Sequence, residues 1–571
     1  MSEVGVQYAM RALPARLQGD ANVANHLFRL PRELLHRPGL ITATWHRNGE
    51  LKRECIWTFS DLQQRVLQCM AWLRQQGLEP GDRVLLMVRP GMELITLCFA
   101  LFRLGVVPIV IDPGMGLGKF KRAVAQSAPV GLIGIPLAHC VSRLFPKSFA
   151  SIEKRIVVQP RSLLAQLDRA GSLQTQDLGV TQSTDAAAVL FTSGSTGAPK
   201  GVCYEHGMFD AQIRLLREQL NIEPGEVDLP MLPIFALFNP AMGMTTVLPE
   251  INPSRPASVD PVKIVAAIQR YQVTNSFGSP VLWRKIGDHC DQQQIQFPQL
   301  RRILVAGAAA PTQLYRQFER ILPQGQLISP YGATECLPVS LISGQEVLSG
   351  TAALTDRGAG ICVGKPLEAV TVRLAPLDGR PVDLALKPKP GEVGEIVVNG
   401  PSVTREYYQL PEATAGAKIL DAGKVWHRMG DVGYFDEQGR LWFCGRRIEA
   451  IHLQDGNDLF TEQVEGPFLT HPQVKRCALV DAAKPHSGDA HRIALVVQPV
   501  EGSWPRSRGA RFAFAAMLAE HLRSNGLHTP VQMVYFLRSL PVDVRHNAKI
   551  HRLTLRRTIQ KQEPIPFHAS H

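Results

Sequence analysis

A run of hydroxyl and glycine residues that ends in a lysine is the part of the sequence best suited to chemistry. Glycines let backbone N–H groups approach an anion, hydroxyls donate to phosphate oxygens, and lysine adds a positive charge. The apolar residues 186–191 (AAAVLF) before this run are typical of a buried strand. The sequence therefore predicts a phosphate-binding loop at the end of a strand. Its residues are Thr192, Ser193, Gly194, Ser195, Thr196, Gly197, Ala198, Pro199, Lys200 and Gly201.

Two better-known loops with glycine and serine do not fit this segment. A Walker A loop does not, because Pro199 precedes and Gly201 follows the lysine. A nucleophile elbow does not, because Ser193 stands where the first glycine should precede Ser195. A plain surface loop is the simpler alternative, yet it would not need Pro-Lys-Gly after a buried strand. We therefore prefer the phosphate interpretation.

Composition and charge limit the possible partners. The 571 residues include 62 Lys and Arg against 50 Asp and Glu, a net charge of +12 that first indicates a polyanion. No basic and aromatic residues interleave on a recognisable nucleic-acid module, so we expect no nucleic acid partner. The apolar stretches 94–111 and 231–249 are interrupted by prolines and glycines, so we expect no transmembrane segment.

Targeting signals and cysteines favour a cytoplasmic protein. Residues 1–20 carry scattered charges and no apolar core, so we expect no signal peptide. The ten cysteines are never closer than 14 positions, which excludes paired zinc-ligand spacing and is typical of buried thiols in a reducing compartment.

The elements that must position the loop alternate between strands and helices. Residues 83–88 and 106–111 predict buried strands, and 92–104 the helix between them, which is a βαβ unit. The same alternation of strands and helices is predicted further along the chain, with a helix at 262–271, a strand at 302–305 and a helix at 311–322. From about residue 367, short strands and turns predict a β-rich subdomain, and a different composition begins after residue 445.

Further segments, in a fixed order along the chain, carry a resemblance to a known family. They are YGATE at 331–335, GDVGY at 430–434, Gly445-Arg446, and the stretch 541–549. With TSGSTGAPKG, this order resembles the adenylate-forming, AMP-binding superfamily over nearly the whole chain. The resemblance implies an α/β and α+β fold. A large multi-lobed N-terminal domain with a β-rich subdomain (1–445) would precede a small mobile α+β cap (446–571).

The resemblance implies ATP and Mg²⁺ as cofactors, with the matching residues in the family's roles. The phosphate loop would hold the triphosphate, and Tyr331 would lie against adenine in a pocket lined by residues 307–309. Asp431 would accept from the ribose hydroxyls, with Arg446 nearby. The implied ATP-binding set is Thr192, Ser193, Gly194, Ser195, Thr196, Gly197, Lys200, Gly307, Ala308, Ala309, Tyr331, Gly332, Asp431 and Arg446.

Three residues are implied in the chemistry itself. Thr334 would contact the α-phosphate, and Glu335 would hold Mg²⁺, which prefers carboxylate oxygen. Lys549 would lie between the substrate carboxylate and the α-phosphate, where a cation stabilises developing charge. Glu449 stands at the implied hinge and is the candidate pivot of the cap. His206 and His427 could act as bases, but we expect structural roles for both.

Within this superfamily, residues 231–249 most resemble the olefin β-lactone synthetases, as do 204–212 and 545–552. That resemblance implies adenylation of a long-chain 2-alkyl-3-hydroxy fatty acid, whose own hydroxyl then closes a β-lactone, and assembly with other enzymes of olefin biosynthesis. Ala236 replaces a histidine that is common in acyl-CoA synthetases. The implied pocket for alkyl chains comprises Phe235, Ala236, Leu237, Phe238, Met242 and Met244.

Two alternatives remain open at this point. A long-chain fatty acyl-CoA synthetase or acyl-AMP ligase would share every adenylation residue and differ only in the acceptor. A non-catalytic nucleotide-binding homologue is the other, although an intact loop together with Glu335 and Lys549 argues against it.

Overall fold

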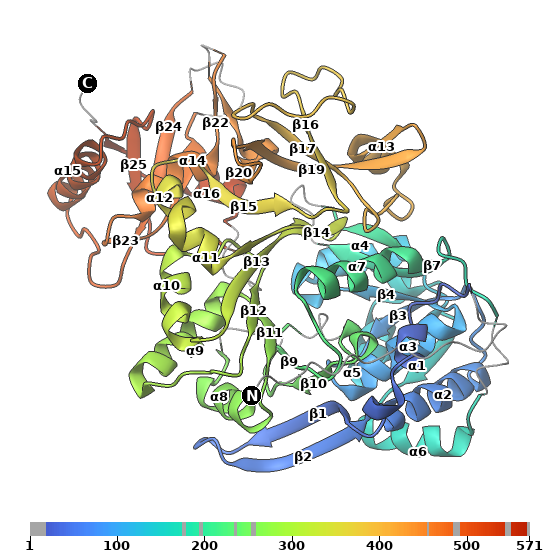
Figure 1. Cartoon of the computed structure of the whole chain (residues 1–571). Helices are drawn as coiled ribbons and strands as arrows, with labels where there is room; N and C mark the ends of the chain where they lie inside the picture. Colours follow the sequence, from blue (N-terminus) through green and yellow to red (C-terminus); the bar gives the residue numbers. More distant parts are fainter. Residues whose placement is uncertain are drawn as a thin grey trace.

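The computed structural model describes residues 19–173, 179–192, 198–232, 237–252, 258–453, 456–483, 491–542 and 550–567. Figure 1 shows two lobes side by side, the blue-to-cyan N-terminal lobe and the green lobe, with the orange and red C-terminal part above the green one. No helix among these residues is long and apolar enough to cross a membrane.

The N-terminal lobe is built on a six-stranded sheet in the order β6-β5-β3-β4-β7-β8. All neighbouring pairs are parallel except β7 and β8, which form an antiparallel edge. The strands are β3 (Arg83–Met87), β4 (Val107–Ile111), β5 (Gly131–Gly134), β6 (Lys154–Val157), β7 (Ala186–Thr192) and β8 (Lys200–Glu205). The helices of this lobe are α1 (Asn25–Phe28), α2 (Phe59–Gln75), α3 (Met92–Leu104), α4 (Leu117–Ser127), α5 (Pro136–Leu144), α6 (Pro160–Ala170) and α7 (His206–Gln219).

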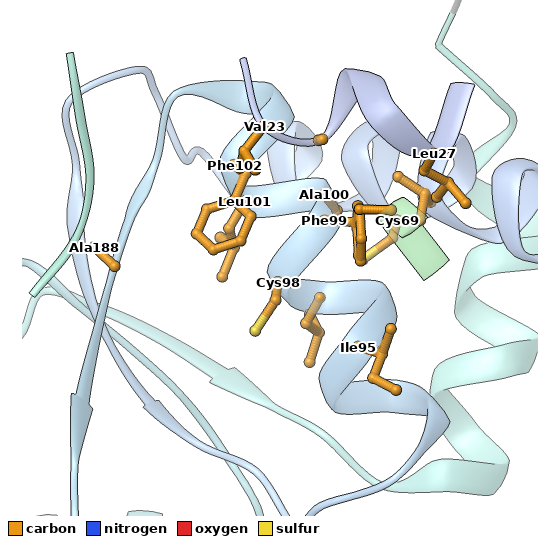
Figure 2. Close-up of a cluster of buried hydrophobic side chains, with 14 of the residues drawn as sticks. Val23, Leu27, Cys69, Ile95, Cys98, Phe99, Ala100, Leu101, Phe102 and Ala188 are labelled. Atoms are coloured by element: carbon orange, nitrogen blue, oxygen red, sulfur yellow. The ribbon is translucent and has the colours of Figure 1, made fainter. Parts of the chain in front are cut away.

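Helix α3 is apolar on every side because it is enclosed. Figure 2 shows Ile95, Cys98, Phe99 and Phe102 pointing from it in different directions, toward residues such as Cys69 of α2 and Ala188 of β7. A helix that is hydrophobic all round belongs in the core of a large protein. This explains why residues 94–111 resemble a membrane segment in composition without being one.

The second sheet has fourteen strands and runs from the green lobe into the C-terminal half, in the order β16-β17-β19-β20-β15-β14-β13-β12-β11-β9-β10-β1-β2, with β18 beside β19. Its strands up to β13 are β1 (Pro38–Trp45), β2 (Leu51–Thr58), β9 (Val227–Pro230), β10 (Thr245–Leu248), β11 (Asn275–Gly278), β12 (Arg302–Val305) and β13 (Gln326–Ala333). The later ones are β14 (Cys336–Ser343), β15 (Ile361–Pro366), β16 (Thr371–Ala375), β17 (Gly394–Asn399), β18 (Lys418–Asp421), β19 (Lys424–Phe435) and β20 (Leu441–Arg446). Its helices are α8 (Pro261–Arg270), α9 (Pro280–Gln293), α10 (Thr312–Ile321), α11 (Gly344–Glu346), α12 (Ala352–Thr355) and α13 (Pro411–Ala417).

The C-terminal part has its own core around a mixed sheet in the order β23-β24-β25-β26. Gly445 marks its junction with the large sheet: at φ +145° its backbone passes so close to α14 that a Cβ would lie 2.5 Å from Thr461 Oγ1. The elements are β21 (Ile451–His452), β22 (Asp458–Leu459), α14 (Thr461–Leu469), β23 (Val474–Asp481), β24 (Ile493–Pro499), α15 (Arg508–Ser524), β25 (Met533–Phe536), α16 (Arg552–Ile559) and β26 (Ile565–Pro566).

The fold class predicted from the sequence is confirmed. The predicted βαβ unit is β3-α3-β4, and the second predicted alternation is α8, β12 and α10, with ends that differ by one residue at most places. The short strands predicted from about residue 367 are present as β16 to β19, and they extend the large sheet through β20. Composition does not reveal this extension, because strand pairing is a non-local property.

Candidate active site

The predicted ribose residues meet on three strands of the large sheet. Asp431 of β19 lies directly opposite Arg446 of β20 in the strand register, and Arg446 Nη1 is 2.8 Å from Asp431 Oδ1. Tyr331 of β13 donates from its hydroxyl to Asp431 Oδ2 at 2.7 Å. The Asp431 carboxylate raises the pKa of Arg446, while burial and the same carboxylate raise the pKa of Tyr331. The result is a carboxylate held in place by side chains of two other strands and able to accept further hydrogen bonds.

The predicted adenine wall follows the carboxyl ends of parallel strands. Gly307, Ala308 and Ala309 come directly after β12, and Tyr331 lies near the end of the neighbouring β13. Gly332 cannot be replaced by a larger residue, because a Cβ there would lie 2.6 Å from the carbonyl oxygen of Cys336. In open parallel sheets, ligands bind outside the carboxyl ends of the strands. The location of these residues therefore suits a planar ligand.

Thr334 and Glu335 form the tight turn between β13 and β14. The Glu335 carbonyl accepts from Thr404 N–H at 2.9 Å, and Glu335 Oε1 accepts from the Tyr407 hydroxyl at 2.8 Å. The Thr334 carbonyl accepts from the Tyr204 hydroxyl. The turn is thus held from two sides, while no hydrogen bond or ion pair to Glu335 Oε2 occurs among the described residues.

The predicted phosphate loop lies in sequence between β7 and β8, two antiparallel strands at the edge of the N-terminal sheet in which Thr192 pairs with Lys200. Ser193, Gly194, Ser195, Thr196 and Gly197 lie outside the described residues, as does the side chain of Thr192. Lys200 Nζ lies 4.9 Å from the centre of the Tyr407 ring, and Tyr408 N–H donates to the Gly201 carbonyl at 2.7 Å. Lys200 and the Thr334–Glu335 turn are therefore linked through residues 404–408.

Lys549 lies outside the described residues, but the nearby Arg552 ties the C-terminal part to the predicted hinge. Arg552 forms ion pairs with Glu449 at 2.9 Å and with Glu465 of α14 at 2.8 Å. Burial alone would lower the pKa of Arg552, but the two carboxylates raise it. Glu462, one turn before Glu465, has its pKa raised to about 8 by burial and by the Glu465 charge.

The predicted apolar pocket is only partly described. Phe235 and Ala236 lie outside the described residues, Leu237 and Phe238 are half-buried, and Met242 and Met244 are buried in the core. The Phe238 ring lies 5.0 Å from Phe209.

A column of aromatic rings continues from this segment toward the turn. Phe209 stacks on Tyr204 at 4.5 Å, and the Tyr204 hydroxyl reaches the carbonyl of Thr334. Aromatic side chains therefore connect the apolar segment with the turn that carries Glu335.

Both candidate histidines are buried and bonded to the backbone. His206 Nδ1 accepts from Val23 N–H at 3.2 Å, and burial lowers the pKa of His206 to about 4. His427 Nδ1 lies 3.2 Å from the Ala417 carbonyl, and burial, with Lys418 nearby, lowers the pKa of His427 well below its usual value. These contacts fit the structural roles expected for them.

The model of the AMP-binding enzyme family matches residues 38–408 of this chain. Olefin beta-lactone synthetase from Stenotrophomonas maltophilia is 41% identical over 88% of this chain and 91% of its own length. The protein of that name from Xanthomonas campestris is 40% identical over 94% and 97%. The chain belongs to the AMP-binding enzyme family. It is an ATP-dependent enzyme of this family, and the predicted resemblance to the olefin β-lactone synthetases is confirmed.

Solved structures of AMP-binding enzymes show the same fold. The amide bond synthetase McbA from Marinactinospora thermotolerans has a TM-score of 0.74 at 23% identity, covering 95% of this chain and 100% of its own. ATP-bound MatB from Rhodopseudomonas palustris has a TM-score of 0.75 at 19% identity, covering 95% and 99%.

Two tyrosines that support the site are absent from the predicted site residues. Tyr407 contacts Glu335 from 72 positions away, and Tyr204 contacts Thr334 from 130. Tyr204 begins the segment 204–212 that carries part of the resemblance, but no local pattern in the sequence indicates what either hydroxyl contacts. Only the packing of the N-terminal lobe against the large sheet brings them to the turn.

Proposed function

We propose that this AMP-binding enzyme is an ATP-dependent β-lactone synthetase acting on a long-chain 2-alkyl-3-hydroxy fatty acid. The observation that carries this proposal is the identity of 40% and 41% to two olefin beta-lactone synthetases over nearly the whole of each protein. The Tyr331–Asp431–Arg446 group, the Thr334–Glu335 turn and the aromatic column beside it support the proposal.

In the first step, a substrate carboxylate oxygen attacks the α-phosphorus of ATP, and pyrophosphate leaves. Asp431 accepts from the ribose hydroxyls, while the hydroxyls of 192–197 and Lys200 hold the triphosphate. Lys549 would lie between the carboxylate and the α-phosphate and stabilise the charge that develops there. Thr334 donates to the α-phosphate.

Glu335 fits a magnesium ligand, because Tyr407 holds one carboxylate oxygen and no hydrogen bond or ion pair among the described residues engages the other. Within the described ranges, no three His, Cys, Asp or Glu side chains gather into a metal site. A single carboxylate suits Mg²⁺, which is usually bound by one or two carboxylates together with substrate phosphates. When bound, the ion neutralises phosphate charge.

In the second step, the 3-hydroxyl oxygen of the substrate attacks its own acyl carbon. The four-membered ring closes, AMP leaves with the bonding electrons, and the hydroxyl proton is released. Because the nucleophile is tethered, proximity replaces the binding of a second substrate. Leu237 and Phe238, with Phe235 and Ala236, hold the alkyl chains and keep water from the adenylate, and Met242 and Met244 support this segment from the core.

Mass analysis of the products tests the proposal. The protein is incubated with ATP, Mg²⁺ and a 2-alkyl-3-hydroxy acid, with and without coenzyme A. A product lighter than the acid by one water, formed without coenzyme A, supports lactone closure. The matched acid without the 3-hydroxyl should release pyrophosphate and give no such product. A thioester formed only with coenzyme A would instead assign the chain to the fatty acyl-CoA synthetases.

The cap would then be residues 446–571, turning about Glu449 between the two steps. The large sheet ends at Arg446, and the separate sheet begins at Val474, which supports this division. We also propose a cytoplasmic location, because single scattered cysteines are typical of a reducing compartment. We also propose that part of the excess positive charge contacts other enzymes of olefin biosynthesis, which co-elution with them at low and high salt would test.

A further inference from the structure

Tyr407 lies at the meeting point of the two sheets that build the phosphate end of the site. Its side chain is buried, and its ring lies beneath Lys200 Nζ at 4.9 Å. Its hydroxyl donates to Glu335 Oε1 at 2.8 Å. One side chain thus contacts the lysine of the N-terminal sheet and the carboxylate of the large sheet.

The backbone around Tyr407 is fixed on both sides. Thr404 donates from both its N–H and its hydroxyl to the Glu335 carbonyl, at 2.9 and 3.2 Å. Lys418 in turn donates to the carbonyl and the hydroxyl of Thr404. On the other side, the Cys203 N–H donates to the Glu406 carbonyl at 3.2 Å. Residues 404–408 therefore act as a clasp between strand β8 and the Thr334–Glu335 turn.

We propose that Tyr407 is a positioning residue of the metal site, orienting the Glu335 carboxylate toward a divalent cation while its ring supports Lys200. This inference rests on the proposed function, because the role of Glu335 as a metal ligand is itself part of that proposal. A carboxylate with one oxygen held by a donor presents the other in a fixed direction. Outer hydrogen-bond partners of this kind typically contribute 10- to 100-fold in metal affinity.

The test uses Tyr407→Phe, which removes the hydroxyl and keeps the ring. Tyr408→Phe is the matched control. The centre of the Tyr408 ring lies 5.5 Å from the Arg83 guanidinium, and the Tyr408 hydroxyl does not contact Glu335. Binding of Mn²⁺ to the full chain with a non-hydrolysable ATP analogue is measured by electron paramagnetic resonance. We expect Tyr407→Phe to weaken Mn²⁺ binding about tenfold and Tyr408→Phe to leave it unchanged.

A double-mutant cycle between Glu335 and Tyr407 gives a second measurement. A general structural role of Tyr407 would not produce coupling between the two substitutions. In Glu335→Gln the charge is lost, so adding Tyr407→Phe should weaken Mn²⁺ binding little further. In steady state, Tyr407→Phe should raise the Mg²⁺ concentration for half-maximal rate while the KM for the acid stays constant. Equal Mn²⁺ affinity of the two tyrosine variants, or additive effects in the cycle, would overturn the inference.

These measurements separate the inference from the proposed function. Mn²⁺ binding requires no acid, so a wild-type protein that binds the metal but forms no lactone would refute the lactone reaction alone. A wild-type protein that binds no Mn²⁺ with the ATP analogue would overturn the role of Glu335 and that of Tyr407 together.

Discussion

The two ends of the proposed site, one for the nucleoside and one for the phosphates, are built in different ways. At the proposed ribose end, Tyr331, Asp431 and Arg446 come from three strands of one sheet, and register alone places Asp431 opposite Arg446. At the proposed phosphate end, a turn of one sheet and strand β8 of another are joined by residues 404–408.

This contrast indicates how the side chains at each end are held in position before a ligand binds. Side chains on paired strands inherit their positions from the backbone ladder, so their geometry needs little further support. Turns and loops lack that ladder and depend on particular side-chain bonds, here those of Tyr407 and Thr404. We therefore expect substitutions at the ribose end to act mainly on ATP binding, and those at the phosphate end mainly on the chemical step and the metal.

The largest effect should follow Lys549→Ala. Removing a cation that stabilises transition-state charge should lower the rate of acid-dependent pyrophosphate release by about 100- to 1,000-fold while ATP still binds. Stopped-flow measurement of pyrophosphate release checks the expected loss of rate, and calorimetry with ATP checks that the variant still binds ATP. Lys561→Ala removes an exposed charge from the same basic tail and serves as the control. A loss shared by both variants would assign the effect to the charge of the tail.

Asp431→Asn breaks the ribose end. Losing charged hydrogen bonds of about 1.5 to 3 kcal/mol should raise the KM for ATP by about 10- to 100-fold, with kcat changed much less. Asp436→Asn is the control, because Asp436 pairs with Arg440 and Trp442 in the turn that follows β19. A fall in kcat at constant KM for ATP would contradict the contrast between the two ends.

Acid should weaken the packing of the N-terminal lobe around His206, where the ring contacts Val23 and Phe102. The folded pKa of His206, about 4, lies below its ordinary value of about 6.5, since burial disfavours the charged ring. Between these values the unfolded chain binds the proton and the folded chain does not, so stability falls as pH falls. This residue should contribute about 2 kcal/mol of lost stability between pH 7 and pH 5.

Urea unfolding of wild type and His206→Gln across this pH range checks the contribution of His206. The slope of stability against pH should be shallower in the variant, whatever its stability at neutral pH. Parallel slopes would show that His206 does not remain neutral.

The smallest effect concerns the apolar segment. Ala236→Trp should raise the KM for long-chain acids by about three- to tenfold, with little change for short ones, because a bulky ring occupies space for alkyl chains. Ala236→Gly is the control of opposite size. The KM is measured for a series of acids of increasing chain length. An unchanged chain-length preference would show that Ala236 does not line the pocket.

The sequence was sufficient to predict the fold class and the family, both of which are confirmed, and it also predicted the individual residues of the two proposed ends. Hydroxyls, glycines and a lysine in one run bind anions through local geometry, and apolar periodicity sets local elements. These signals are contained within about twenty residues. That is why α3 and β12 agree with the prediction to the residue.

Only the tertiary structure decided which residues support one another. Tyr331 reaches Asp431 across 100 positions and Tyr407 reaches Glu335 across 72, through strand register and contact between two sheets. It also placed Met242 and Met244, both predicted to belong to the pocket for alkyl chains, among the buried side chains of the N-terminal core. Pairing between distant segments depends on the packing of the whole chain, so a local sequence pattern cannot predict it.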